Sequence, residues 1–158
     1  MKPEIKTLES KKLIGMQKSM SFANNTTPAL WEGFMPRKKE IQNVVGSDLY
    51  SIQSYGADFF KNFDPLKTFN KWAAVEVSDF DSVPAGMEGF ILPQGLYAVF
   101  YYKGLNTDPS IFQYILGTWL PASGYQLDSR PHFEVLGPKY KNNDPESEEE
   151  IWIPIQKK

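Results

Sequence analysis

A single glutamate stands between apolar residues near the end of this 158-residue chain. Glu134 lies between Phe133 and Val135, in a segment from His132 to Leu136 whose pattern predicts a strand. Because an unpaired buried charge is costly, such a carboxylate must be solvated, paired with a cation, or kept free for a ligand. Pairing with Arg130 or with a lysine in a surface hairpin is one open alternative, and ligand binding is another.

His132, the only histidine, lies two residues from Glu134 on the same predicted strand face. One histidine without any cysteine provides too few ligands for a zinc site. The sequence also lacks a Gly-x-Ser-x-Gly elbow, a Gly-x-Gly-x-x-Gly loop and a Walker-type loop. We therefore expect no metal and no cofactor, and we expect His132 to be exposed at a sheet edge.

Composition narrows the class of protein. The net charge is −2 and the only cationic cluster is Arg37-Lys38-Lys39, so we expect no direct binding to nucleic acid. The chain has no cysteine, no apolar export signal and no apolar run of about 18 residues, so we expect a cytoplasmic protein that does not enter the membrane. Aromatic residues make up 15% of the chain, and whether they line a pocket or only the core stays open.

The first half predicts one helix among strands. The expected elements are a strand over 13–22, a helix over 28–46, and strands over 49–53 and 71–77. Thr27 and Pro28 are typical of a helix start, and Gly46 is typical of a helix C-cap. Pro36 inside the helix predicts a kink near Met35.

The second half predicts the same order of elements. The expected elements are a strand over 95–104, a helix over 109–120, and strands over 125–127, 132–136 and 151–155. Asp108 and Pro109 repeat the signal for a helix start, and Pro121 is expected to end the helix. The acidic run from Lys139 to Glu150 is typical of a solvated loop.

The two predicted helix starts are 81 positions apart, and the flanking strands are displaced by about the same amount. This pattern indicates an internal duplication, with half-modules at about 1–80 and 90–158 and a linker over 79–93 that is rich in proline and glycine. We predict an α+β fold in which one domain, 1–158, contains two strand-helix-strand-strand modules with pseudo-twofold symmetry. Its antiparallel sheet would carry helices on one face and a ligand groove on the other.

Several short segments occur in a recognisable order. They are Ala74–Asp79, Val83–Met87, Gly95–Phe100, Gly117–Tyr125, Pro131–Glu134 and Ile151–Ile155. In order and spacing, the chain from Lys71 to its end resembles the gyrase-inhibitor-like (GyrI-like) small-molecule-binding family. The domain of this family is also the effector-binding module of AraC-type and related transcription regulators, which are bacterial proteins. The first half matches mainly in pattern, through Leu30-Trp31 and Tyr55-Gly56.

The resemblance implies a duplicated fold with a glutamate at the centre of an aromatic pocket of the multidrug-binding type. It supports Glu134 and Trp119 best as ligand-binding residues. Tyr97 is a further candidate for the pocket wall. Trp31 and Tyr55 are added from the first half by symmetry and aromatic bias, and a place in the core is the alternative for both.

Two departures from the family pattern concern the pocket. Leu136 stands where a tyrosine is common, and Ala73-Ala74 stands where an Ala-Gly pair is common. These differences predict a drier pocket of different shape. About 12 residues precede the first expected strand, too few for a helix-turn-helix domain, so we expect a stand-alone form without a DNA-binding domain.

Three functions are compatible with these features. The leading hypothesis is a binding protein that senses or sequesters lipophilic, cationic or polycyclic compounds. A partly desolvated carboxylate attracts a poorly hydrated cation, and each aromatic ring around that cation adds about 0.5–2 kcal/mol of binding energy through cation–π attraction. The resemblance also implies an alternative, a hydrolase of cyclopropane-containing polycyclic toxins in which Glu134 would be catalytic. A third possibility is a protein interaction module with gyrase or a regulator as its partner. The residues leave binding and turnover open.

Overall fold

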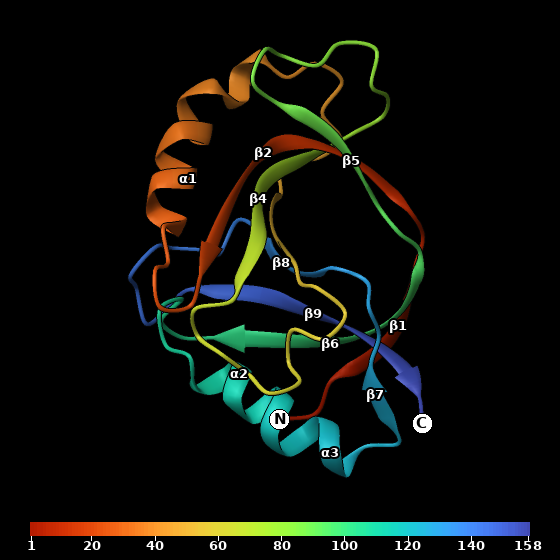
Figure 1. The fold of residues 1–158 in the computed structure, drawn as a ribbon. Coiled ribbons are helices and arrows are strands. Elements are labelled where there is room, and N and C mark those ends of the chain that lie inside the picture. The colour runs from red at the N-terminus through yellow and green to blue at the C-terminus, as the bar shows by residue number, and fades with distance from the viewer.

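An antiparallel sheet and two helical segments make up the fold of residues 1–158 in the computed structural model (Figure 1). The strands are β1 (Glu4–Leu8), β2 (Lys11–Ser21), β3 (Leu49–Ser54), β4 (Thr68–Val77), β5 (Glu88–Leu92), β6 (Gly95–Lys103), β7 (Tyr125–Leu127), β8 (His132–Leu136) and β9 (Glu148–Lys157). The helical segments are α1 (Thr27–Phe34) with a 3-10 extension (Met35–Glu40), and α2 (Ser110–Tyr114) with a π-helical turn (Ile115–Trp119) and α3 (Leu120–Ala122). The predicted α+β class is confirmed.

The order of strands in the sheet displays the internal duplication. The order is β1-β6-β9-β8-β3-β4-β2-β5, and β7 pairs with β9 outside this path. By their order in the chain, β1, β2, β3 and β4 of the first half correspond to β5, β6, β8 and β9 of the second half. When each strand is exchanged for its counterpart, the order reads the same from both ends. A pseudo-twofold axis therefore passes between β3 and β8. Ser51 lies opposite Glu134 in that central pair. The predicted pseudo-twofold duplication is confirmed, and Glu134 lies beside its axis.

The edge strands β1 and β5 have no counterpart among the predicted elements. Two residues join β1 to β2, and two residues join β5 to β6. Each edge strand nevertheless pairs with a strand of the other half of the chain, β1 with β6 and β5 with β2. Only Leu8 is buried in β1 and only Leu92 in β5, so neither strand shows the alternation that would reveal it. β5 lies inside the segment 79–93 that reads as a linker.

The helices differ from the predicted ones at their ends. The first does not reach Gly46, because the chain turns into a 3-10 helix at Met35, one residue before Pro36, and leaves the helical conformation at Ile41. The second continues one residue past Pro121, through the π-helical turn and α3. The predicted change of helix geometry near Met35 is confirmed, whereas Pro121 does not end its helix.

The two faces of the sheet carry different cores. On one face lies an inner core without any helical residue, made of Leu8, Leu13, Tyr50, Ile52, Trp72, Ala74, Leu92, Tyr97, Val99, Phe133 and Val135. On the other face, α1 buries Leu30 and Phe34 against one cluster, and α2 with its extension buries Ile111 and Ile115 against another. Figure 1 shows the sheet curling around the inner core with α1 and α2–α3 on its outside, well apart from each other.

The structure corrects the face on which Glu134 was expected. Phe133 and Val135 belong to the inner core, where the Phe133 ring stacks on Trp152 with centroids 5.2 Å apart, and no helix covers them. Glu134 therefore lies on the helix-bearing face, between the areas that the two helical segments cover. Alternation along a strand separates two faces, but it does not say which face the helices will occupy.

Close packing of β2 on β4 gives a first prediction. A Cβ atom at Gly15 would overlap the carbonyl oxygen of Ala73 and lie 2.7 Å from Cα of Ala74, whereas a Cβ at Gly33 in α1 would meet nothing within 4 Å. We expect Gly15→Ala to lower the free energy of unfolding by about 2–3 kcal/mol, because backbone atoms of a central strand would have to move. Gly33→Ala is the control, and it should stabilise the helix by up to about 1 kcal/mol. Urea denaturation measures both, and equal effects would contradict the close approach.

Candidate functional site

Glu134 provides a buried carboxylate at the centre of the helix-bearing face. It is 9% exposed, with Ser51 of β3 opposite on one side and Ile151 of β9 on the other. Its Oε1 accepts one long hydrogen bond, 3.4 Å, from Nε2 of Gln53, and its Oε2 is buried without any hydrogen-bond partner. Burial raises the pKa of Glu134 to about 7, while Lys71 and Gln53 act in the opposite direction. A buried acceptor without a partner is rare in proteins and requires a reason, such as a ligand.

Two further charged side chains face Glu134 from the flanking strands. The β3–β4 and β8–β9 registers place Lys71 of β4 and Glu149 of β9 on its side of the sheet, and both are half-buried. Burial, together with the charge of Glu134, raises the pKa of Glu149 to about 8. Burial lowers the pKa of Lys71, and the two glutamates oppose that shift. The centre of this face is thus a cluster of two carboxyls and one ammonium.

Tyrosines from two equivalent loops border the carboxylate. Tyr55 begins the loop between β3 and β4, and Tyr140 lies in the loop between β8 and β9. Burial raises the pKa of both hydroxyls, and the charge of Glu134 adds to the shift in each case. Tyr55 is fixed by ring contacts to Phe59 and Phe60, with centroids 4.7 and 4.9 Å away. Tyr55 thus packs against the core cluster under α1 and lies near enough to Glu134 for its charge to act on the hydroxyl.

His132 is part of the wall of this site and is not exposed. It is 7% exposed, and its ring lies 4.9 Å from Tyr55 and 5.7 Å from Phe60, centroid to centroid. Burial lowers the pKa of His132 to about 3, so the ring is neutral at physiological pH. The expectation of an exposed edge histidine is wrong because β8 lies in the middle of the sheet, with β3 and β9 as neighbours.

Trp31 and Trp119 lie on the helical segments at either side of the face that carries Glu134. Trp31 packs edge-on against Phe34 of α1, with centroids 5.9 Å apart, and Trp119 packs against Phe100 of β6 at 5.2 Å. Both are half-buried and adjoin the cores under their own helices. Each contributes to its core, and each lies on the helix-bearing face with Glu134.

Tyr97 lies on the opposite face of the sheet from Glu134. It is fully buried in the inner core, its ring is 5.3 Å from that of Phe133, and its hydroxyl donates a hydrogen bond of 2.9 Å to the Pro131 carbonyl. The structure does not bring Tyr97 together with Glu134. The strand Gly95–Lys103 is apolar on both faces in its middle, so the sequence gives no sign of the direction in which Tyr97 points.

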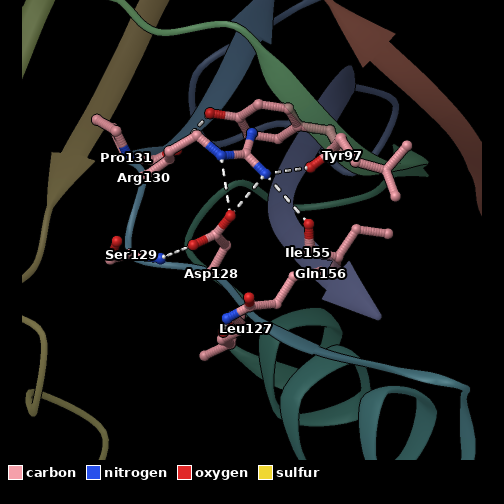
Figure 2. Close-up of polar contacts among 9 residues, drawn as sticks. Tyr97, Leu127, Asp128, Ser129, Arg130, Pro131, Ile155 and Gln156 are labelled. Carbon is pink, nitrogen blue, oxygen red and sulfur yellow. Dashed lines mark hydrogen bonds and ion pairs between the residues drawn. The ribbon is translucent and has the colours of Figure 1, made fainter. Parts of the chain in front are cut away.

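Arg130 is not the partner of Glu134: its Nε and Nη2 atoms bind other groups, and its Nη1 atom is buried without a hydrogen-bond partner. Its guanidinium lies 4.7 Å from the centroid of the Tyr97 ring and 3.2 Å from the Asp128 carboxylate, and Figure 2 shows this arrangement. The same guanidinium donates hydrogen bonds to the carbonyls of Leu96, at 2.7 Å, and Ile155, at 3.1 Å. Arg130 therefore fastens the connection between β7 and β8 to β6 and β9.

Besides His132, four residues of the site were not among the predicted ones: Gln53, Lys71, Tyr140 and Glu149. Lys71 interrupts an otherwise apolar face of β4, between Phe69 and Ala73, and this interruption is a signal that sequence reasoning could have used. Glu149 was hidden in the acidic run 139–150, which reads as a solvated loop. Its last three residues instead begin β9 and are half-buried.

A surface pocket of about 450 Å³ opens beside Glu149. Its lining residues are Asp48, Tyr101, Tyr102, Lys103, Val135, Gly137, Pro138, Lys139, Glu148, Glu149 and Glu150. Acidic groups outnumber the lysines, so the pocket favours cations. No group of three His, Cys, Asp or Glu side chains is arranged to hold a metal ion. None of the helices is long and apolar enough to span a membrane.

Comparison with curated proteins identifies a regulator as a relative. The transcriptional regulator BrlR of Pseudomonas aeruginosa is 33% identical over 147 residues, which are 90% of this chain and 51% of BrlR. The chain therefore spans about half the length of the curated relative that it matches.

Solved structures and a family model agree on the fold. The C-terminal domain of EcmrR matches with a TM-score of 0.74 and 14% identity, over 99% of this chain and 98% of that domain. SAV2435 bound to tetraphenylphosphonium matches with a TM-score of 0.65 and 17% identity, over 99% of this chain and 94% of SAV2435. At these identities the two matches show the fold alone. The model of the GyrI-like small molecule binding domain matches residues 1–156, and the chain therefore belongs to the GyrI-like family.

Proposed function

We propose that this domain binds lipophilic cations and that Glu134 is the anionic group that holds them. The observation that carries the proposal is the Oε2 atom of Glu134, which is buried, has no hydrogen-bond partner and lies on the same face as Lys71 and Glu149. An ion that brings little hydration of its own can satisfy such an oxygen without a large desolvation penalty. Large aromatic cations meet this condition.

The surrounding rings suit a flat or aromatic ligand. Tyr55 and Tyr140 approach Glu134 from pseudo-equivalent loops, and the neutral ring of His132 adds apolar surface beside Tyr55. Rings around a bound cation contribute about 0.5–2 kcal/mol each through cation–π attraction. Because Glu134 is only 9% exposed, a ligand can reach its carboxylate only if the groups that cover it move.

The relatives support the choice of ligand and of role. SAV2435 was solved with tetraphenylphosphonium, a lipophilic cation, and BrlR is a transcriptional regulator. We infer that this domain senses or sequesters compounds of the same chemical class. Tetraphenylphosphonium is therefore the probe for the experiments below.

Removal of the charge of Glu134 should weaken binding of tetraphenylphosphonium. We expect Glu134→Gln to raise the dissociation constant about 10–100-fold, because a desolvated charge pair is lost while the shape is kept. Glu76→Gln is the control, since Glu76 of β4 lies on the same face as Trp72 and Ala74 of the inner core and so points away from Glu134. Isothermal titration calorimetry at pH 8 gives the dissociation constants of wild type, Glu134→Gln and the control variant. Equal affinity in wild type and Glu134→Gln would remove Glu134 from the mechanism.

Binding should also depend on pH. The ligand requires an ionised Glu134, and burial raises the pKa of Glu134 to about 7, so the ionised fraction grows as pH rises through 7. We expect the affinity for tetraphenylphosphonium to increase about 10-fold between pH 6 and pH 8, and ionisation of Glu149, whose pKa is about 8, should extend the increase above pH 8. The same titrations with Glu134→Gln should show a flatter profile. A wild-type profile that falls with rising pH would contradict this assignment.

Tyr97 should act in stability and not in binding. Tyr97→Phe removes the hydrogen bond to the Pro131 carbonyl and keeps the ring in the inner core, so we expect the free energy of unfolding to fall by about 1 kcal/mol. The affinity for tetraphenylphosphonium should stay within about twofold of wild type, a difference of less than 0.5 kcal/mol. Denaturation and calorimetry on one preparation test both statements. A loss of affinity with unchanged stability would place Tyr97 in the pocket after all.

A further inference from the structure

The cluster around Glu134 holds unequal numbers of positive and negative groups. Two carboxyls, Glu134 on β8 and Glu149 on β9, face one ammonium, Lys71 on β4. Apart from Lys18, an exposed lysine opposite Lys71 on β2, the other titratable groups near the cluster carry no charge at neutral pH, because His132, Tyr55 and Tyr140 remain neutral there. When both carboxyls are ionised, Lys71 can balance only one of them.

The sheet directs Lys71 toward the carboxyls. Lys71 pairs with Gln53 of β3 on one side, and Gln53 in turn donates to Glu134. On its other side Lys71 pairs with Lys18 of β2, an exposed lysine. Like charges opposite each other on neighbouring strands repel. The Lys71 ammonium is therefore driven away from β2 and toward the centre of the sheet, where the two glutamates attract it.

Lys71 acts on the carboxyls without direct contact. It forms none of the ion pairs within 4 Å that other lysines of the chain form, and the Oε2 atom of Glu134 stays without a partner. In a partly buried cluster a charge several ångströms away still has a sizeable effect, because solvent screens it weakly. An ammonium in this place lowers the energy of both carboxylates and raises the energy of any second cation nearby.

We propose that Lys71 is the internal counter-cation of the Glu134–Glu149 pair, and that a cationic ligand binds in competition with it. The ligand half of this statement rests on the proposed function, whereas the counter-cation half does not. Lys71 thereby sets the selectivity of the site: it weakens binding of cations in general, so that only those with enough aromatic or apolar surface bind well.

The first arm of the test measures affinity. Lys71→Met keeps most of the side-chain length and removes the charge. We expect it to tighten binding of tetraphenylphosphonium about 10-fold at pH 9, above the wild-type pKa values of about 7 and 8 of the two carboxyls, because one nearby like charge is removed. At lower pH the gain should shrink, because the same variant raises those pKa values. Lys18→Met removes the same charge from the adjacent, exposed position on the same face, and we expect a change of less than about threefold. Lys71→Gln serves as a second variant if Lys71→Met does not fold. Equal changes of affinity in Lys71→Met and Lys18→Met would overturn the proposal that the ligand competes with Lys71.

The second arm needs no ligand. Carbon-13 NMR of the glutamate carboxyls between pH 5 and pH 10 should show higher pKa values for Glu134 and Glu149 in Lys71→Met than in wild type, and unchanged values in Lys18→Met. If wild type does not bind tetraphenylphosphonium, the proposed function fails and this arm alone decides the role of Lys71. Carboxyl pKa values that are the same in Lys71→Met and wild type would overturn the counter-cation assignment whatever the binding data show.

Discussion

The pairing of β3 with β8 is the constraint on which the rest of the structure depends. These strands flank the pseudo-twofold axis, and their five-residue register places Ser51 opposite Glu134. Because side chains alternate along a strand, a slip by one residue would turn Glu134 into the inner core and expose Phe133 to the helix-bearing face. Burial of Phe133 against Trp152 and Tyr97 therefore fixes the direction of Glu134 as well. The inner core and the site are two consequences of one register.

Duplication supplies a symmetric frame, and the chemistry of the site comes from the differences between the halves. Across the axis a serine faces the only glutamate of the central pair, and the flanking strands carry a lysine on β4 and a glutamate on β9. The loops after β3 and β8 both bring a tyrosine to the site, but only the loop after β3 adds the rings of Phe59 and Phe60. A symmetric set of side chains at an axis would present two equal charges to a ligand, whereas this set presents one central carboxylate.

Patterns within short stretches of the sequence predicted those strands whose burial shows in their own residues. Alternation located β2, a run of aromatic and β-branched residues between two glycines located β6, and the apolar neighbours of Glu134 identified it as unusual. The edge strands β1 and β5 escaped because their burial depends on pairing with the opposite half of the chain. Tyr97 was misplaced because its strand is apolar on both faces. Lys71 lies in the other half of the chain from Glu134, and Tyr140 and Glu149 follow Glu134 in the next loop and in β9, so only the strand pairing of the sheet brings all three to Glu134.

Ionised Glu134 opposes folding, and this explains why the site suits a ligand. Its pKa in the folded chain, about 7, is above its ordinary value of 4.5, so the fold favours the protonated form. The contribution of Glu134 to the free energy of unfolding is therefore most favourable below pH 4.5. It decreases as pH rises from 4.5 to 7 and stays at its low value above pH 7. The difference between the two pKa values corresponds to about 3 kcal/mol of folding free energy, a substantial part of the stability of a typical domain. Lys71 offsets this loss only partly, because it also serves Glu149 and is itself half-buried. Under the proposed function, a bound lipophilic cation would supply the missing charge without water, so that binding would both draw the proton off Glu134 and stabilise the fold.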